Sequence, residues 1–210
     1  MTTNGSGDHL ITSVAELERL YGEPNPNSLM KEIDYINLHY RAFIEAAPFV
    51  VLASVGPEGL DGSPRGDAPG FVRVRDEKTL LLPDRRGNNR IDTLKNIVRD
   101  PRVSLLFLIP GIGETLRING RAAISVDPAL CGSFIVQGKA PRSVLVVTVD
   151  RVYFQCQKAL VRSKLWDPAS RIERSALPST GTMLAALSQG TVDSDAFDRA
   201  YPERLKDTIY

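Results

Sequence analysis

From residue 49 to residue 154 the chain consists of short β-rich segments separated by turn signals, and this pattern limits its fold more than any other feature. Each segment is an apolar or β-branched run, which is typical of a strand. The expected strands are 49–55, 61–74, 79–83, 103–109, 115–126 and 143–154. One helical pattern, 91–98, separates the third strand from the fourth. Because helices and strands do not alternate, we expect a mainly β, α+β fold: a closed or partly closed antiparallel barrel of about six strands with peripheral helices.

Helices are expected before the first strand. Ser13 and Glu16 have the spacing of a capping box, and Gly22 is suited to end the short helix that they begin. Asn27 or Ser28 would cap a longer helix that continues almost to the first strand, because apolar residues recur there at steps of three and four.

The chain is expected to have three parts. Residues 1–47 form an N-terminal helical extension, residues 48–166 the barrel, and residues 167–210 a C-terminal tail. The tail has helical patches at 183–187 and 197–205, which we expect to pack on the barrel or on a partner chain.

The chain contains two histidines and two cysteines, and this scarcity limits the chemistry that its own side chains can perform. His9 follows a polar, glycine-rich start that predicts a mobile tail, whereas His39 is expected to be a partly buried helix residue. Neither His-x-x-x-His nor Cys-x-x-Cys occurs, so a zinc site of ordinary ligand spacing is disfavoured. Cys131 and Cys156 make no disulfide framework, and Cys156 is expected to be a small buried apolar residue.

The net charge is +1, which disfavours a general nucleic-acid binder. No apolar stretch follows Met1, so no signal peptide is expected. The longest apolar run, 105–109, is too short to span a bilayer. We therefore expect a cytoplasmic protein with reduced thiols and with no membrane or nucleic-acid partner.

Two nucleotide-binding motifs are present only in part. Gly111-Ile112-Gly113 begins like a dinucleotide fingerprint, but Leu116 replaces its third glycine and a strand follows instead of a helix. Gly138-Lys139 is followed by Ala140, and Ser133 stands where a P-loop needs its first glycine. The chain is therefore expected to contain neither a dinucleotide-binding fingerprint nor a P-loop.

Arginines and small polar residues gather in three neighbouring runs, Ser63–Asp67, Leu82–Asp84 and Asn88–Arg90. An anion there would meet arginine side chains and free N–H groups at a helix N-terminus. Three such bonds at ~1.5–3 kcal/mol each give roughly 5–9 kcal/mol before ordering costs. The runs therefore fit a phosphorylated ligand, although a solvated loop and helix face would have the same arginines.

Five runs together resemble a known family. They are Asp61–Arg65, Asn88–Arg90 with Leu94 and Asn96, Asp100–Val103, Gly113–Ala122 and Cys156–Trp166. In this order, residues from about 45 to 165 resemble the FMN-binding split barrels of the pyridoxamine 5′-phosphate oxidase-like superfamily. The last two runs are the most specific, and resemble a branch whose members mostly lack an assigned substrate.

The resemblance implies a homodimer with FMN at the subunit interface. The strand beside the flavin ring would contain Arg65, Gly66, Asp67 and Ala68, and the neighbouring strand Leu82 and Pro83. The phosphate-binding turn would be formed by Asn88, Asn89 and Arg90. Residues presented from the dimer side would be Thr115 and Arg117. The pocket would be closed by Lys158, Arg162, Ser163 and Trp166, for the last of which a core anchor at a helix end is the alternative.

The chain departs from the oxidase itself in two places. Asn89-Arg90 replaces the Arg-Lys pair of the phosphate turn, and Arg85 or Arg86 would have to compensate. The C-terminal Arg-x-His substrate element is missing, because no histidine follows His39. Oxidation of pyridoxamine phosphate is therefore not expected.

The resemblance implies an FMN-dependent oxidoreductase, since the cofactor of a flavoenzyme performs the redox chemistry. Hydride would pass between the flavin and a small organic substrate, or from NADH or NADPH to the flavin. Asp67 and Glu114 are the candidates for proton handling, with a strand-end salt bridge as the alternative for Glu114. The alternative function is non-enzymatic binding of a flavin or related cofactor on the same barrel. Haem is disfavoured because His39 is the only structured histidine expected.

Overall fold

The computed structural model describes residues 9–210, so the mobile tail predicted at residues 2–8 lies outside the described residues. Contacts between Cα atoms divide the chain into two units, one ending at Glu32 and the other beginning at Ile33. The first unit contains two short helices, α1 (Val14–Tyr21) and α2 (Pro26–Met30).

The predicted start and end of the first helix are confirmed. The Ser13 hydroxyl oxygen accepts a hydrogen bond from the Glu16 N–H at 3.2 Å. Gly22 ends α1 with a positive φ of 71°, and its N–H donates to the Glu18 carbonyl at 2.8 Å. A glycine is favoured at this position because a Cβ would strain the backbone.

The prediction of one long helix from Asn27 or Ser28 to the first strand is wrong. The apolar periodicity belongs to two separate helices, α2 and α3 (Leu38–Ala46). Between them Ile33 pairs with Val152 in an antiparallel β-bridge, with N–H···O distances of 3.1 and 2.8 Å. The side chain of Asn37 then caps α3 by accepting the Tyr40 N–H. Tertiary pairing with a strand distant in sequence thus overrides the helical pattern.

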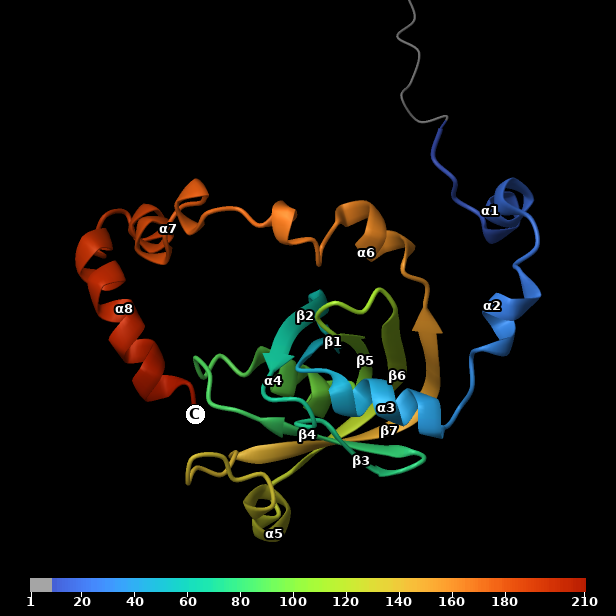
Figure 1. Ribbon diagram of the computed structural model, residues 1–210, viewed down its shortest axis with the longest axis horizontal. Helices are drawn as coiled ribbons and strands as arrows, with labels where there is room; N and C mark the ends of the chain where they lie inside the picture. Colours follow the sequence, from blue (N-terminus) through green and yellow to red (C-terminus); the bar gives the residue numbers. More distant parts are fainter. Residues whose placement is uncertain (1–8) are drawn as a thin grey trace, which may run out of the picture. The chain divides into compact units, whose positions relative to one another are not determined.

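Seven antiparallel strands form one sheet in the order β2-β1-β5-β6-β7-β4-β3 (Figure 1). Their bounds are Phe49–Gly56, Gly59–Gly66, Arg73–Asp76, Thr79–Asp84, Arg102–Leu108, Thr115–Ser125 and Ser143–Gln155 for β1 to β7. The antiparallel, mainly β architecture with peripheral helices is confirmed. The sheet does not close, since β2 and β3 are its two edges. The remaining helices are α4 (Asp92–Arg99), α5 (Pro128–Gly132), α6 (Lys158–Ser163), α7 (Thr180–Leu187) and α8 (Ser194–Thr208).

The predicted strand over residues 61–74 is instead two strands, β2 and β3, which lie at opposite edges of the sheet. Pro69 and Gly70 break the strand, and Gly70 adopts a positive φ of 83°. Phe71 and Val72 then bury their side chains in the core, so the chain crosses from one edge to the other.

The long strands β6 and β7 join the two halves of the sheet. The first part of β6 pairs with β5, and the first part of β7 pairs with β4. The register between β6 and β7 shifts between Asn119 and Gly120. A Cβ on Gly120 would lie 2.1 Å from the Thr148 carbonyl oxygen, so the two strands approach each other closely only because this residue is glycine.

We expect Gly120→Ala to lower the free energy of unfolding by about 1–3 kcal/mol, because the strands must move apart. Urea unfolding followed by circular dichroism measures this loss. Gly62→Ala in β2 is the matched control, since nothing lies within 4 Å of its added Cβ. Equal losses in the two variants would contradict the close approach at Gly120.

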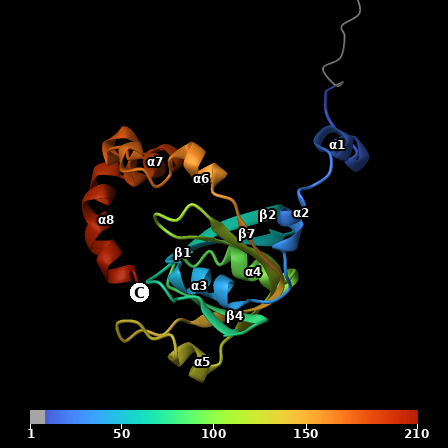
Figure 2. The ribbon, with the colours of Figure 1, turned by 45° about the vertical axis from the view of Figure 1, so that its right-hand side comes forward.

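One apolar core lies between the two halves of the sheet. Leu52 and Leu105 come from one half, Leu80 and Val147 from the other, and all four side chains are buried. Helix α3 covers this core with Tyr40 and Ile44, and α4 adds Ile97 (Figures 1 and 2). The pairing of β2 with β1, and the packing of β4 and α4 on this core, position the site described below.

The tail contains α7 and α8, in agreement with the helical patches predicted at 183–187 and 197–205. The two helices meet near their N-terminal ends (Figure 2), where Asp198 joins them by accepting hydrogen bonds from Ser179 and from the Gly181 N–H. Among the helices of residues 9–210, none has the length and apolar character needed to cross a membrane.

Two predictions of burial are wrong. His39 is exposed, because it precedes Tyr40 on α3 and it is Tyr40 that faces the core. Cys156 is exposed as well, since it directly follows β7, where the chain leaves the sheet; Cys131 is buried.

Candidate cofactor-binding site

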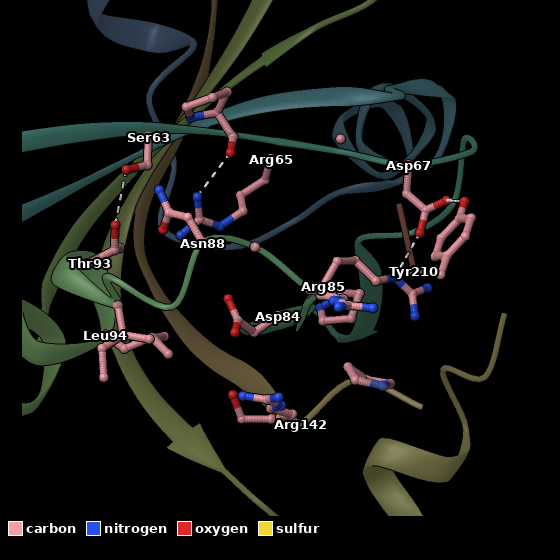
Figure 3. Close-up of a pocket in the computed structure, with 18 of the residues that line it drawn as sticks. Ser63, Arg65, Asp67, Asp84, Arg85, Asn88, Thr93, Leu94, Arg142 and Tyr210 are labelled. Atoms are coloured by element: carbon pink, nitrogen blue, oxygen red, sulfur yellow. Dashed lines mark hydrogen bonds and ion pairs between the residues drawn. The ribbon is translucent and has the colours of Figure 1, made fainter. Parts of the chain in front are cut away.

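A cavity of about 1080 Å³ opens where the edge strand β2, the end of β4 and the first turn of α4 meet (Figure 3). The loop over residues 139–143 and the pair Ile209 and Tyr210 complete its wall. Its size matches the upper end of small-molecule and cofactor pockets.

The strand period explains why polar side chains line this cavity. Successive side chains of a strand point to opposite faces, so Asp61, Ser63 and Arg65 share one face of β2. All three are half-buried and line the cavity, whereas the residues between them are exposed. On its outer side β2 has no neighbouring strand within the described sheet, so backbone groups there are available to a ligand.

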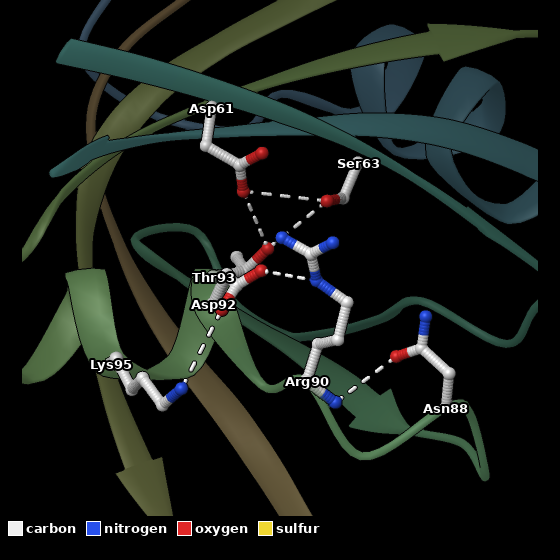
Figure 4. A network of polar contacts seen from close by, with 7 residues as sticks. All are labelled: Asp61, Ser63, Asn88, Arg90, Asp92, Thr93 and Lys95. Atoms are coloured by element: carbon white, nitrogen blue, oxygen red, sulfur yellow. Dashed lines mark hydrogen bonds and ion pairs between the residues drawn. The ribbon is translucent and has the colours of Figure 1, made fainter. Parts of the chain in front are cut away.

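Hydrogen bonds connect β2 to the beginning of α4 (Figure 4). The Thr93 hydroxyl lies 2.9 Å from Asp61 Oδ2 and 3.1 Å from Ser63 Oγ. Nearby, Arg90 Nε contacts Asp92 Oδ2 at 2.8 Å, and the Arg90 N–H donates to Asn88 Oδ1 at 3.1 Å. The loop before α4 is therefore held in place by its own polar side chains.

A second polar cluster, formed by Asp67, Arg85 and Tyr210, closes the other end of the cavity (Figure 3). Arg85 Nε lies 2.8 Å from Asp67 Oδ2, and the two side chains are only 16% and 4% exposed. The Tyr210 hydroxyl donates to Asp67 Oδ1 at 2.7 Å. Burial favours a raised pKa of Asp67, but hydrogen bonds from Tyr210 and the Ala68 N–H, together with Arg85, hold this pKa below its ordinary value.

We expect Tyr210→Phe to cost about 1.5 kcal/mol of unfolding free energy at pH 7, since it removes one hydrogen bond to a carboxylate. The lowered pKa of Asp67 stabilises the fold above the ordinary carboxyl value, and this contribution is lost as pH falls through the folded pKa. The effect of Tyr210→Phe should therefore shrink from about pH 4 downward. Urea unfolding of the variant and the wild type at pH 7 and in acid measures the loss of unfolding free energy at each pH.

The matched control is Tyr201→Phe. Tyr201 is 41% exposed and stacks on Phe197 in α8, and its hydroxyl makes no hydrogen bond with any residue of 9–210. A loss for Tyr210→Phe that is equal at all pH values would contradict the link to Asp67.

The cavity has a net positive lining. Its charged side chains are the cations Arg65, Arg85, Arg86, Arg90, Lys139 and Arg142 and the carboxylates of Asp61, Asp67, Asp84 and Asp92. Arg85 and Arg90 are occupied by ion pairs with carboxylates. In contrast, Arg65, Arg86 and Arg142 make no ion pair with any residue that the structure describes. These three cations are therefore available to an anionic ligand.

Asp84 ends β4 at the floor of this cavity. Burial raises the pKa of its carboxyl, and the charges of Arg65 and Arg142 oppose that rise. Arg142 also lies 3.4 Å from Asn89 Oδ1, measured from Nη1.

The cavity brings together eight of the predicted cofactor-binding residues, which are Arg65, Gly66, Asp67, Ala68, Pro83, Asn88, Asn89 and Arg90. Leu82 does not line it, because its side chain is buried in the core. Two of the backbone donors are already used: the Asp67 N–H donates to the Pro48 carbonyl and the Ala68 N–H to the Asp67 side chain.

The other predicted residues lie outside this cavity of the single chain. Thr115 and Arg117 are on β6, where Arg117 Nη1 contacts the Tyr153 hydroxyl at 2.9 Å. Lys158, Arg162 and Ser163 are on α6. Trp166 donates from Nε1 to the Ile112 carbonyl at 2.8 Å and ties the α6 region to that loop. Their roles at a dimer interface stay predictions.

The sequence alone assigns no site role to Lys139, Arg142 or Tyr210, all of which line the cavity. Asp84 is expected beside a phosphorylated ligand only as the end of the run Leu82–Asp84. In the sequence, Lys139 belongs only to an incomplete P-loop motif. The pairing of Asp84 with Ser143 is what brings Arg142 to the cavity, and strand pairing over this distance cannot be read from the sequence.

Comparison with known proteins identifies the family. Residues 36–156, which run from just before α3 to the end of β7, match the family described as pyridoxamine 5′-phosphate oxidase. The chain belongs to this family. The match contains β1 to β7 and most of the cavity wall, and it stops short of α6 and the tail. Among curated proteins, none matches the chain.

Several solved structures are similar to this chain in fold. HupZ of Group A Streptococcus is 18% identical over 56% of this chain and 91% of that one, with a TM-score of 0.46. General stress protein 26 of Bacillus anthracis is 18% identical over 54% of this chain and 88% of that one, with a TM-score of 0.40. An FAD-binding protein of Mesorhizobium loti is 15% identical over 56% of this chain and 90% of that one, with a TM-score of 0.40. The family assignment depends on the family match alone.

Proposed function

We propose that the protein is an FMN-dependent oxidoreductase that acts on a small organic substrate by hydride transfer, with its site at the interface of a homodimer. The observation that carries this proposal is the set of unpaired cations in a cavity of cofactor size. Arg65, Arg86 and Arg142 face this cavity without an ion pair to the described residues, beside the amides of Asn88 and Asn89. Such a set suits a phosphate monoester.

The cavity residues suit FMN in charge, and the cavity volume of about 1080 Å³ is large enough for a cofactor. The phosphate would lie between Arg65, Arg142 and Asn88, and the ring along the free edge of β2 near Gly66. Arg90 would contribute less than the resemblance implies, because Asp92 already neutralises it. When bound, FMN would supply hydride chemistry, with NADH or NADPH as the source of electrons.

The chain's own residues would bind and orient rather than react. The buried Asp67–Arg85 pair and Tyr210 close one end of the cavity and would reduce access of water there. Orientation of the substrate at this wall would supply the rate acceleration. In a dimer, Thr115 and Arg117 of each copy would approach the cavity of the other.

A flavin carrier without catalysis is the second candidate. It is favoured by the composition of the cavity wall, which among its described residues contains neither histidine nor cysteine as a proton handler. The two functions differ in whether the bound flavin reacts.

The absorbance of the purified protein tests the proposal. We expect a flavin spectrum that disappears on addition of NADH or NADPH and returns in air. A bound flavin that neither nicotinamide nor any small organic substrate reduces would favour the carrier. A colourless protein that takes up no added FMN would contradict both.

A further inference from the structure

We propose that Asp84 accepts a hydrogen bond from a hydroxyl next to the phosphate of the bound ligand, so that the cavity selects phosphate esters of polyols over phosphate itself. This inference rests on the proposed function, since FMN carries such hydroxyls on its ribityl chain. The cavity would then recognise a hydroxyl group of the ligand as well as the charge of its phosphate.

The first observation is the position of Asp84. It is the last residue of β4, it is half-buried, and its partner in β7 is Ser143. Its carboxylate faces the cavity in the region between Arg65, Asn88 and Arg142 (Figure 3). It therefore lies next to the cations that would bind a phosphate.

The second observation is that Arg65 and Arg142 act on the Asp84 carboxylate through their charge alone. Within residues 9–210, Asp84 makes neither a hydrogen bond nor an ion pair. The other three carboxylates of the cavity are different: Asp61 is bonded to Thr93, and Asp67 and Asp92 are paired with arginines. A half-buried carboxylate without donors is costly, so a ligand that brings a donor is favoured.

The negative charge of Asp84 acts differently on phosphate and on a phosphate ester of a polyol. A bare phosphate between Arg65 and Arg142 would face the negative charge of Asp84 and be repelled. A phosphate ester with a neighbouring hydroxyl is repelled in the same way. However, its hydroxyl also donates a hydrogen bond to the Asp84 carboxylate, and this bond favours binding of the ester. Asp84 therefore weakens binding of phosphate and strengthens binding of a polyol phosphate.

Calorimetric titration of the flavin-free protein with inorganic phosphate and with ribose 5-phosphate tests this inference. In the wild type we expect ribose 5-phosphate to bind at least about 10-fold more tightly than phosphate. In Asp84→Ala, phosphate should bind more tightly and ribose 5-phosphate more weakly, so that the ratio falls toward one. Asp84→Asn, which keeps the shape and one acceptor oxygen, should strengthen phosphate binding while retaining part of the preference.

Asp150→Ala is the control, because Asp150 is exposed on β7 and does not line the cavity. It should leave both affinities unchanged. Equal changes for the two ligands in Asp84→Ala, or no binding of either ligand to the wild type, would overturn the inference. The proposed function is tested separately with FMN. If FMN does not bind but the ribose 5-phosphate preference depends on Asp84, the inference stands and the FMN proposal fails.

Discussion

Replacement of Asp67 by alanine is expected to lower the free energy of unfolding by about 3 kcal/mol. The substitution leaves the Arg85 guanidinium, which is only 16% exposed, without its carboxylate and removes the acceptor of the Tyr210 hydroxyl. The cost of an unpaired buried charge exceeds the value of the pair itself, so the loss is large. Urea unfolding at pH 7 measures it.

Asp150→Ala is the matched control for this prediction. Asp150 pairs with Arg121 at 3.9 Å, and both side chains are more than half exposed. Exposed pairs contribute about 0–1 kcal/mol, so this variant should unfold almost as the wild type does. Similar losses in Asp67→Ala and Asp150→Ala would show that the Asp67–Arg85 pair does not hold the wall of the cavity.

The double variant Arg65→Ala/Arg142→Ala is expected to weaken FMN binding by at least about 100-fold. A hydrogen bond to a charged group contributes about 1.5–3 kcal/mol, and about 1.4 kcal/mol corresponds to a tenfold change in affinity. Neither arginine is paired with a carboxylate of the described chain, so each is free to bind the phosphate. Quenching of FMN fluorescence on titration measures the affinity.

Arg90→Ala is the comparison that distinguishes this arrangement from the one that the sequence resemblance implies. Arg90 is 76% exposed and its guanidinium is bonded to Asp92. We therefore expect a smaller loss for Arg90→Ala than for either Arg65→Ala or Arg142→Ala. Retention of FMN by the double variant, with loss in Arg90→Ala, would place the phosphate at the helix start instead.

The β-rich part of the fold could be predicted from the sequence because its signals are local. Turn residues and apolar runs separate the strands, and the segments at Thr79, Arg102 and Thr115 begin within a residue of where the structure has them. The helix from Asn27 failed because a bridge between Ile33 and Val152 breaks it, and no local pattern contains that pairing.

The candidate site could be predicted only where its residues are close in sequence. Arg65–Ala68 and Asn88–Arg90 are such runs, and the cavity brings them together. Tyr210 reaches Asp67 from 143 residues away, and Arg142 arrives through the pairing of β4 with β7. These contacts are tertiary, so residue spacing carries no sign of them.

The central claim is that this cavity binds FMN through its unpaired arginines. Equilibrium dialysis of the flavin-free protein against FMN tests it most directly. We predict saturable binding of one FMN per chain in the wild type and its loss in Arg65→Ala/Arg142→Ala, with both proteins folded. No uptake of FMN by the wild type, or equal uptake by the two proteins, would contradict the claim.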